Sequence, residues 1–364
     1  MQQKTDTSFL LVVCALIVSG LLVFTSAGLG LLARDGATFT SVAISQLLLG
    51  LVCGGIAMYI LARLDYRLWR PYTPYIFAAA MFVTALTLIP GIGVELKGAS
   101  RWLVIGGFSF QPVEMLKFAS VIFLAAVYAA RFKDVQTWKG GLLPLALVAG
   151  SASLILLAQP DTHGIVMILL ASVGMLYAAG GRMLHLLMLA LIGLLALGVL
   201  AYERPYLASR FQTFFNQSDD PQGAGWQIQQ SLIAVGSGQL TGRGFGQSLE
   251  KFSYLPEPIG DSIFAVAAEE FGFIGSTMLV LLFGAFGVLG FRIAARAPDP
   301  FGALLVVGLV ILIVGQSFLN IASAVGLAPI SGLPLIFVSH GGTAFALALA
   351  EVGVILSVSR RMKA

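Results

Sequence analysis

The fold is decided by residues 257–291, which read EPIGDSIFAVAAEEFGFIGSTMLVLLFGAFGVLGF. From residue 263 this stretch stays apolar for longer than the roughly 20 residues that a helix needs to cross about 30 Å of hydrocarbon. Three carboxylates, those of Asp261, Glu269 and Glu270, stand in or beside the apolar run. The stretch therefore predicts a membrane-spanning helix with acidic groups at one end.

Similar apolar runs recur along the whole chain. Hydrophobic residues make up 58% of the sequence, charged residues only 10%, and the mean hydropathy is +0.93. Soluble domains carry about 25% charged residues on average. The composition excludes a soluble globular domain and predicts an all-α integral membrane protein, a single polytopic domain over residues 1–364. Cys14 and Cys53 fall inside predicted spans without metal-type spacing, so we expect structural thiols.

Hydropathy predicts ten membrane spans, with one large outer loop at about 203–262 between spans seven and eight. The predicted spans are 8–29, 40–62, 73–91, 112–130, 141–158, 163–180, 183–202, 263–291, 301–324 and 334–358.

Basic residues are unevenly divided between the two sides of this topology. Thirteen fall on one side: Lys4, Arg63, Arg67, Arg70, Arg131, Lys133, Lys139, Arg182, Arg292, Arg296, Arg360, Arg361 and Lys363. The short loops of the other side hold three, Arg34, Lys97 and Arg101. The positive-inside rule therefore predicts that both termini lie in the cytoplasm. The same asymmetry accounts for the net charge of +4, so we expect membrane lipids rather than nucleic acid as partners.

The large outer loop is expected to carry function, because other loops in the chain are short. Its stretch WQIQQSLIAVGSG (226–238) has helix-like apolar spacing and predicts an amphipathic helix at the outer membrane surface. The stretch GRGFGQS (242–248) resembles a phosphate-binding loop but lacks the preceding strand and the Lys-Ser/Thr pair of a nucleotide site, so a turn is the better interpretation. Arg210, Arg243 and Lys251 could contact a diphosphate head group.

The acidic residues of the opening stretch allow two interpretations each. Asp261 could be a general base whose pKa is raised at the rim of the bilayer, or it could cap the following helix, which its position alone favours. Glu269 and Glu270 lie too far along the helix to cap it. At least one of them should point into the bundle, with either a structural or a substrate role.

Other polar residues within apolar runs are further candidates. Glu114 and Lys117 are three residues apart and should share one helical face, as a structural ion pair or a substrate site. Asp161 and His163 stand in an outer loop, where the distance to other histidines argues against a metal site. Further polar positions are Arg101, Gln316, Asn320 and Glu351; the amides are interpreted first as helix-packing groups, and Glu351 receives no role.

Several motifs together resemble the SEDS family (shape, elongation, division and sporulation), of the FtsW and RodA type. They are KGASRWLVIGGFSFQPVEMLKFA, QPDTHG, GAGWQIQQSLIAVGSGQLTGRGFGQSLEKFSYLPEPIGDSIFAVAAEEFGFIG and NIASAVGLAPISGLPLIFVSHGGTA. The similarity spans roughly residues 8–361, and GQSLEKFSYLPEP is closer to the division branch, FtsW, than to RodA. The resemblance implies an inverting peptidoglycan glycosyltransferase that polymerises lipid II and works with a class B penicillin-binding protein.

The resemblance also implies roles for particular residues. Asp261 matches the family's essential aspartate, Glu114 and Lys117 match its Q-P-x-E-x-x-K motif, and Asp161 matches its P-D motif. The chain departs from the family at IGDS (usually HTDF), at SHGG with Ser339 and His340 (usually SYGG), and at Thr162 and His163 (commonly LG). His163 or His340 could replace the histidine missing before the aspartate.

The implied mechanism is a single displacement at the sugar carbon. Asp261 would deprotonate the acceptor hydroxyl, and Arg101, Lys117 and Arg210, or a divalent cation (Mg or Mn), would meet the diphosphate. A lipid II flippase is the alternative, and it predicts essential groups at several depths, including Glu351. An ion-coupled transporter ranks third, because neither broken helices nor internal symmetry is evident.

Overall fold

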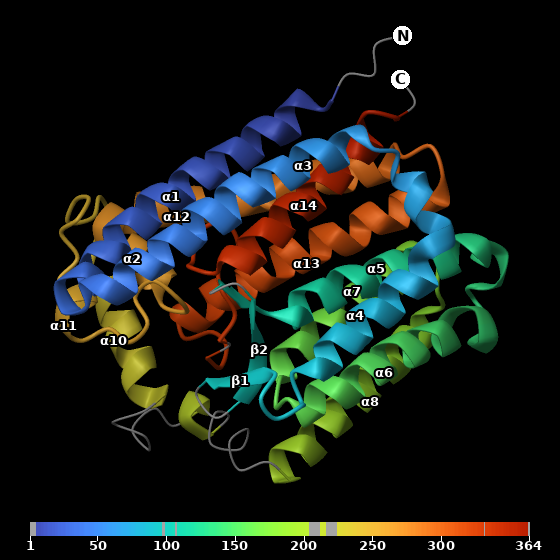
Figure 1. Ribbon diagram of the computed structural model, residues 1–364, viewed down its shortest axis with the longest axis horizontal. Coiled ribbons are helices and arrows are strands. Elements are labelled where there is room, and N and C mark those ends of the chain that lie inside the picture. The colour runs from blue at the N-terminus through green and yellow to red at the C-terminus, as the bar shows by residue number, and fades with distance from the viewer. Residues whose placement is uncertain are drawn as a thin grey trace.

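The chain folds into a bundle of long helices in a computed structural model that describes residues 5–96, 99–105, 108–203, 212–215, 224–330 and 332–362. Figure 1 shows the helices running side by side, with both termini at one end. The two ends of the chain are tied together, because the Asp6 N–H donates to Ser359 Oγ at 2.8 Å and Arg360 Nε donates to Thr5 Oγ1 at 3.0 Å.

The first half of the bundle is built from short and long helical segments in sequence. They are α1 (Thr7–Arg34), α2 (Gly36–Ile44), the π-helix η1 (Ser45–Cys53), α3 (Gly54–Arg63), the 3₁₀ segment η2 (Tyr66–Tyr72), α4 (Thr73–Leu86) and α5 (Pro112–Ala130). After the short segments η3 (Phe132–Asp134) and η4 (Trp138–Leu142) follow α6 (Leu143–Ala158), α7 (Thr162–Ala178) and α8 (Met183–Glu203).

The second half contains α10 (Ala224–Ser237), the short α11 (Glu250–Ser253), α12 (Ile263–Ala295), α13 (Pro300–Ala324) and α14 (Gly342–Ser359). Aspartates cap several helices: the Phe9, Gly164 and Gly302 N–H groups donate to Asp6, Asp161 and Asp299 respectively. The predicted helix at 226–238 is confirmed as α10, which packs on α12.

Within the described residues, seven helical stretches are long and apolar enough to cross a membrane. Helix α7 and the stretch Met183–Gly193 of α8 are apolar but shorter, and α4 has 14 residues. The predicted polytopic helical membrane protein is thus confirmed in outline. Helices α14 and α5 lie at its centre, where 89% and 72% of their apolar stretches are buried. Both cysteines are free thiols.

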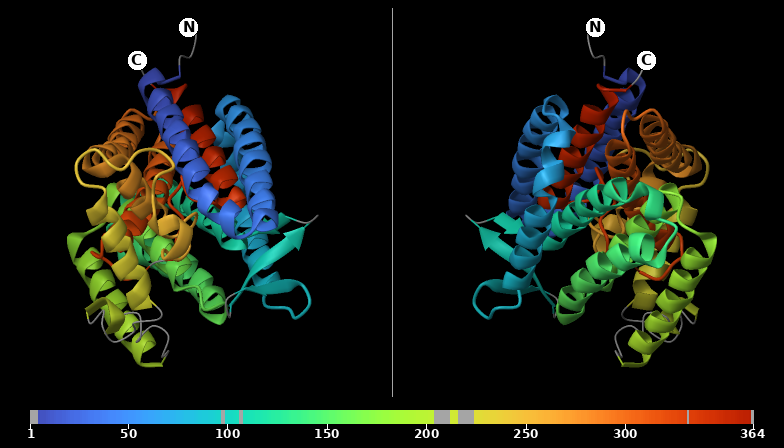
Figure 2. Two further views of the ribbon diagram at one scale, coloured as in Figure 1. Left: turned by 90° about the vertical axis from the view of Figure 1, so that its left-hand side faces the viewer. Right: turned by 90° about the vertical axis from the view of Figure 1, so that its right-hand side faces the viewer.

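The expectation of an all-α fold is wrong in one region, because residues 93–96, 99–105 and 108–110 form an antiparallel sheet. Its strands are β1 (Gly93–Leu96), β2 (Ala99–Ile105) and β3 (Phe108–Phe110), and β2 is the middle strand. Leu103 pairs with Gly93 on one side and with Phe110 on the other. The sheet projects from the bundle, away from the termini (Figure 2).

Two predicted spans were also placed wrongly at one end. The predicted span 73–91 ends as a helix at Leu86, ahead of Pro90 and Gly91. The predicted span 334–358 is helical only from Gly342, because residues 334–341 form a buried loop in which Phe337 has a φ of 68°. Its backbone is satisfied by protein groups: His340 N–H donates to Ile259 O at 2.8 Å, and Gly341 N–H donates to Gln46 Oε1 at 3.0 Å. Irregular backbone is stable in a membrane protein where protein replaces lipid around it.

Candidate active site

Asp261 lies on the turn that leads into α12, and its side chain is half-buried. The turn is closed by the Gly260 and Ser262 N–H groups, which donate to Glu257 O at 3.0 and 3.2 Å. The residue in the N-cap position is Ser262, and no side chain caps the helix there. Asp261 therefore stands one residue before the N-cap position of α12.

Two neighbouring segments hold the backbone of this turn. Asn320 Nδ2 of α13 donates to Asp261 O at 3.0 Å and to Leu333 O at 2.7 Å. Ser339 Oγ donates to Gly260 O at 2.8 Å. The amide Asn320, interpreted from sequence as a helix-packing residue, thus binds the turn that carries Asp261. The loop 334–341 and α13 together fix the position of this carboxylate.

His163 of α7 and Asp261 both lie near Gly332. Gly332 has a φ of 64°, which favours glycine, and a Cβ built on it would lie 3.7 Å from His163 Cε1 and 3.8 Å from Asp261 Oδ2, both ordinary contact distances. The imidazole and the carboxylate therefore flank the same glycine. A water-sized cavity of about 10 Å³ adjoins Asp261, lined in part by Gln227, Ser231 and Ser323.

Arg101 of β2 and Asp161, the N-cap residue of α7, form an ion pair. Arg101 Nη1 lies 3.9 Å from Asp161 Oδ1, and its other nitrogens donate to the carbonyls of Gln159 (3.2 Å) and Pro160. Gln159 Nε2 in turn donates to Thr84 O at 2.7 Å. Asp161 is buried, while 22% of the Arg101 side chain remains exposed. This guanidinium is fixed in position and still accessible to an anion.

The Glu114–Lys117 pair predicted from spacing is formed. Lys117 Nζ lies 2.7 Å from Glu114 Oε2 and donates to Gln316 Oε1 of α13 at 2.6 Å. Glu351 of α14 lines the same small cavity as these three residues. Glu114, Lys117, Gln316 and Glu351 thus form a polar centre between α5, α13 and α14. The Lys117 side chain is only 4% exposed, so its ammonium binds within this polar centre and not at the surface.

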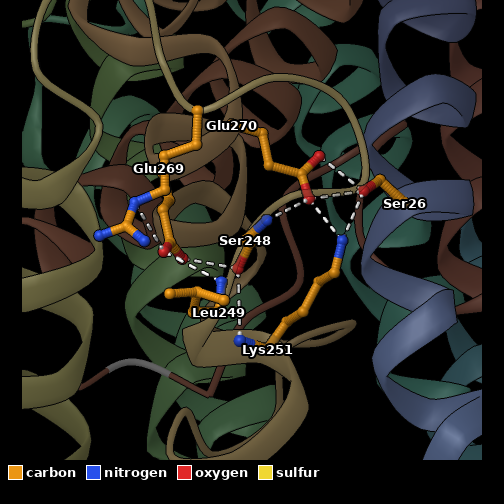
Figure 3. Close-up of polar contacts among 7 residues, drawn as sticks. Ser26, Ser248, Leu249, Lys251, Glu269 and Glu270 are labelled. Carbon is orange, nitrogen blue, oxygen red and sulfur yellow. Dashed lines mark hydrogen bonds and ion pairs between the residues drawn. The ribbon is translucent and has the colours of Figure 1, made fainter.

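Glu269 and Glu270 both point into the protein, where they bind the large loop (Figure 3). Glu270 accepts from Lys251 Nζ at 2.5 Å and from Ser26 Oγ of α1 at 2.6 Å. Glu269 accepts from Ser248 Oγ at 2.6 Å and from the Leu249 N–H at 3.1 Å. The prediction that at least one glutamate faces the bundle is confirmed for both.

Two charged side chains, those of Arg243 and Glu250, lie beside the cluster that Glu269 and Glu270 form with the large loop. Arg243 Nε lies 3.4 Å from Glu269 Oε1, and 37% of the Arg243 side chain is exposed. Glu250 begins α11; burial, then the charge of Glu269, raises its pKa, and Arg243 opposes that shift. The Lys251 ammonium is fully buried and paired, so the cluster anchors the loop and leaves Arg243 as its accessible cation.

The glycine-rich stretch 242–248 forms turns, as the turn interpretation predicted, and most of its amides donate to protein oxygens. The Arg243 and Gly244 N–H groups donate to Glu269 O and Glu270 O, each at 3.0 Å. The close contact between this stretch and α12 depends on Gly272, where α12 kinks with a φ of 64° and ψ of −165°. A Cβ on Gly272 would lie 2.3 Å from Gly242 N.

The remaining predicted residues divide into three groups. Arg210 lies outside the described residues. Ser339 and Gln316 support the loop 334–341, since Gln316 Nε2 donates to Pro334 O at 3.2 Å. His340 binds the Asp261 turn through its backbone. Among the described residues, no group of three or more His, Cys, Asp or Glu side chains could hold a metal ion.

Sequence reasoning missed Ser26, Ser248 and Gln46. Ser26 and Ser248 look like ordinary small polar residues, and only tertiary contact shows that they bind glutamates. Gln46 carried a signal, because it is a large amide inside an apolar run. It is buried in η1, where Gln46 Nε2 donates to Ser339 O at 3.1 Å.

The fold and the site define a polytopic helical membrane protein with a polar centre between α5, α13 and α14 and with a buried ion pair that anchors the large loop on α12. The chain belongs to the FtsW/RodA/SpoVE family, described as cell cycle proteins, whose sequence profile matches residues 6–364. The resemblance found in the motifs is thus confirmed.

Individual relatives match along most of the chain. Stage V sporulation protein E of Bacillus subtilis (strain 168) is 41% identical over 307 residues, 84% of each chain. A probable peptidoglycan glycosyltransferase FtsW of Geobacter sp. (strain M18) is 35% identical over 330 residues, 91% of this chain and 89% of its own.

Solved structures have the same fold. A chain from "Structural coordination of polymerization and crosslinking by a peptidoglycan synthase complex" has a TM-score of 0.77 and 26% identity, covering 98% of both chains. The rod shape determining protein RodA of Thermus thermophilus has a TM-score of 0.71 and 26% identity, covering 98% of this chain and 97% of its own.

Proposed function

We propose that this protein is a peptidoglycan glycosyltransferase that polymerises lipid II, with Asp261 as the general base. The observation that carries the proposal is a half-buried aspartate at the start of α12 in a chain that matches a probable peptidoglycan glycosyltransferase over 91% of its length. A carboxylate within hydrogen-bond reach of a hydroxyl can act as its general base.

The reaction requires a base, a leaving-group site and a fixed geometry. Asp261 takes the proton of the acceptor sugar hydroxyl while that oxygen displaces the diphosphate at the donor sugar carbon, which inverts its configuration. Developing charge on the diphosphate is stabilised by cations that are held in position yet accessible. Arg101 and Arg243 meet both conditions, since their partners Asp161 and Glu269 are buried and their own side chains are partly exposed.

His163 is the second group at the base. Its imidazole and the Asp261 carboxylate flank Gly332, which supports the idea that His163 replaces the histidine that the family usually carries before this aspartate. A neighbouring imidazole can orient the carboxylate or share its proton. Lys117 and Lys251 are assigned supporting roles instead of diphosphate binding, because their ammonium groups are buried and paired.

The substrate's lipid tail requires an apolar path beside the site. A groove of about 590 Å³ lies between α2, the start of η1 and the sheet, lined by Ala37, Thr40, Ser41, Ile44, Ser45, Val104 and Ser109. Strand β2 contributes Val104 to this groove and also carries Arg101. The mixture of polar and apolar groups suits a lipid entering with its head group toward the sheet.

The topology that accompanies this function is ten spans with cytoplasmic termini. Termini at one end of the bundle support an even number of spans, and the basic residues of the loops support the orientation (Figure 1). A class B penicillin-binding protein is the proposed partner, supported by the fold shared with a peptidoglycan synthase complex.

The flippase alternative receives less support. It requires charged groups along a path wide enough for a sugar head group. Glu351, Glu114 and Lys117 instead surround a cavity of about 10 Å³, the size of one water molecule.

Purified protein given labelled lipid II, alone and with its cognate transpeptidase, tests the proposal. Glycan ladders are the expected product. Translocation of lipid II across vesicle membranes without any ladder would replace the polymerase with the flippase.

A further inference from the structure

The polar centre between α5, α13 and α14 contains one more negative charge than the Glu114–Lys117 pair accounts for. Lys117 is bound to Glu114 Oε2 and Gln316 Oε1, at 2.7 and 2.6 Å. The second carboxyl group is that of Glu351, a residue that is 7% exposed and lines the same cavity. Within the part of the chain that the structure describes, Glu351 makes no hydrogen bond or ion pair.

The elements packed on α14 offer no other charge to compensate Glu351. Neither η1 nor α13 contains a charged residue. The charged residues of α3 and η2, Arg63, Arg67 and Arg70, are exposed at the surface. Those of α12 are Glu269 and Glu270, which bind the large loop, and the exposed Arg292. Lys117 and Glu114 are therefore the charged groups that face Glu351.

An isolated carboxylate inside a membrane protein is costly unless a positive charge joins it. The cavity has a volume of about 10 Å³, enough for one water molecule or one small ion. Of the three N–H donors of Lys117, two are used by Glu114 and Gln316, so the third can serve a water molecule in this cavity.

We propose that Glu351, with Glu114, Lys117 and Gln316, forms an intramembrane site that takes up a single positive charge, as a proton or as Na⁺. This site is separate from the Asp261 turn, and it does not depend on the polymerase assignment. The two are mechanically linked, because Gln316 Nε2 donates to Pro334 O at 3.2 Å, at the start of the loop whose Ser339 holds Gly260.

Infrared difference spectra and thermal unfolding of the purified protein test this site, in NaCl and in choline chloride at neutral pH. Three variants are compared with the wild type: Glu351→Gln, Glu351→Asp and, as the matched control, Asp35→Asn, which alters an exposed carboxylate. If the charge is a proton, the wild type shows a protonated-carboxyl band that Glu351→Gln lacks, that Glu351→Asp shifts and that Asp35→Asn leaves unchanged.

If the charge is Na⁺, that band is absent and NaCl raises the unfolding temperature of the wild type but not of Glu351→Gln. A wild type with neither the band nor an NaCl-dependent shift would overturn the proposal, because Glu351 would then be ionised without a compensating charge. This outcome can be read from the wild type alone, even if both Glu351 variants fail to fold.

Discussion

Lys251 Nζ and Glu270 Oε1 lie 2.5 Å apart, and both side chains are fully buried. This pair joins the large loop to α12, and Ser26 extends it to α1 (Figure 3). Because the neighbouring Glu269 is bound in the same way by Ser248 and Leu249, the end of α12 that follows Asp261 is held by the loop. The contacts that anchor the large loop therefore also hold the start of α12, directly after the Asp261 turn.

Lys251→Met is expected to destabilise the protein by about 3–5 kcal/mol, because it leaves the Glu270 carboxylate buried without its cation. Thermal or denaturant unfolding measures this change. Arg67→Gln, which breaks the more exposed pair with Asp299, should cost only about 0–1 kcal/mol. Equal losses in the two variants would show that burial of the Lys251–Glu270 pair has no energetic consequence.

Gly272→Ala is expected to destabilise the protein by about 1–3 kcal/mol or more, since alanine strains a φ of 64° and its Cβ meets Gly242 N at 2.3 Å. The matched control is Gly284→Ala in the same helix, where a Cβ meets nothing within 4 Å. That change should stabilise the helix by about 0.5–1 kcal/mol. A Gly272→Ala protein as stable as Gly284→Ala would contradict the close approach of the loop to α12.

Glu250 makes stability depend on pH. Because burial and the charge of Glu269 raise its pKa, ionisation is less favourable in the folded protein than in the unfolded chain. Its contribution is fully present below the ordinary glutamate pKa of about 4.3 and is lost as the pH rises through the raised value. Glu250→Gln should therefore unfold at a higher temperature than the wild type at pH 7.

That difference should close as the pH falls toward about 4.3. Unfolding scans of the two proteins across this range measure it, and a difference independent of pH would show that the effect of the substitution is not electrostatic.

Asn320→Ala removes the two hydrogen bonds that Asn320 Nδ2 donates, leaving the carbonyls of Asp261 and Leu333 without this partner. An unmade buried hydrogen bond costs about 1–3 kcal/mol. Displacement of the base should slow polymerisation by about tenfold for each 1.4 kcal/mol of lost transition-state stabilisation. The expected signature is a lower kcat with little change in KM. A variant that loses only thermal stability, with kcat intact, would limit Asn320 to packing.

Much of this arrangement was predictable from the sequence. Hydropathy located most of the helices, and the i, i+3 spacing of Glu114 and Lys117 predicted their ion pair because one helix determines it. The spacing rule could not assign Glu351, whose neighbours come from two other helices. Likewise, the Lys251–Glu270 pair depends on how a loop folds back onto α12.

The errors have identifiable physical causes. Residues 93–110 contain β-prone runs separated by glycines, a hairpin signal that hydropathy averages away. The apolar residues 335–338 read as the start of a span, although they form a loop whose backbone is satisfied by Gln46, Ile259 and Ser339. His163 and Asp261 both lie within 4 Å of a Cβ built on Gly332, although about a hundred residues of sequence separate them, and no local pattern encodes this shared neighbour.

Glycan synthesis by Asp261→Asn tests the central claim most directly. With labelled lipid II, we expect the wild type and the control Asp35→Asn to produce ladders, and Asp261→Asn to lose about 10²–10⁴-fold in rate while still binding lipid II. Asp35 is a suitable control because it is exposed and caps α2, a role that asparagine also fills. Ladders from Asp261→Asn at the wild-type rate would contradict the assignment of Asp261 as the base.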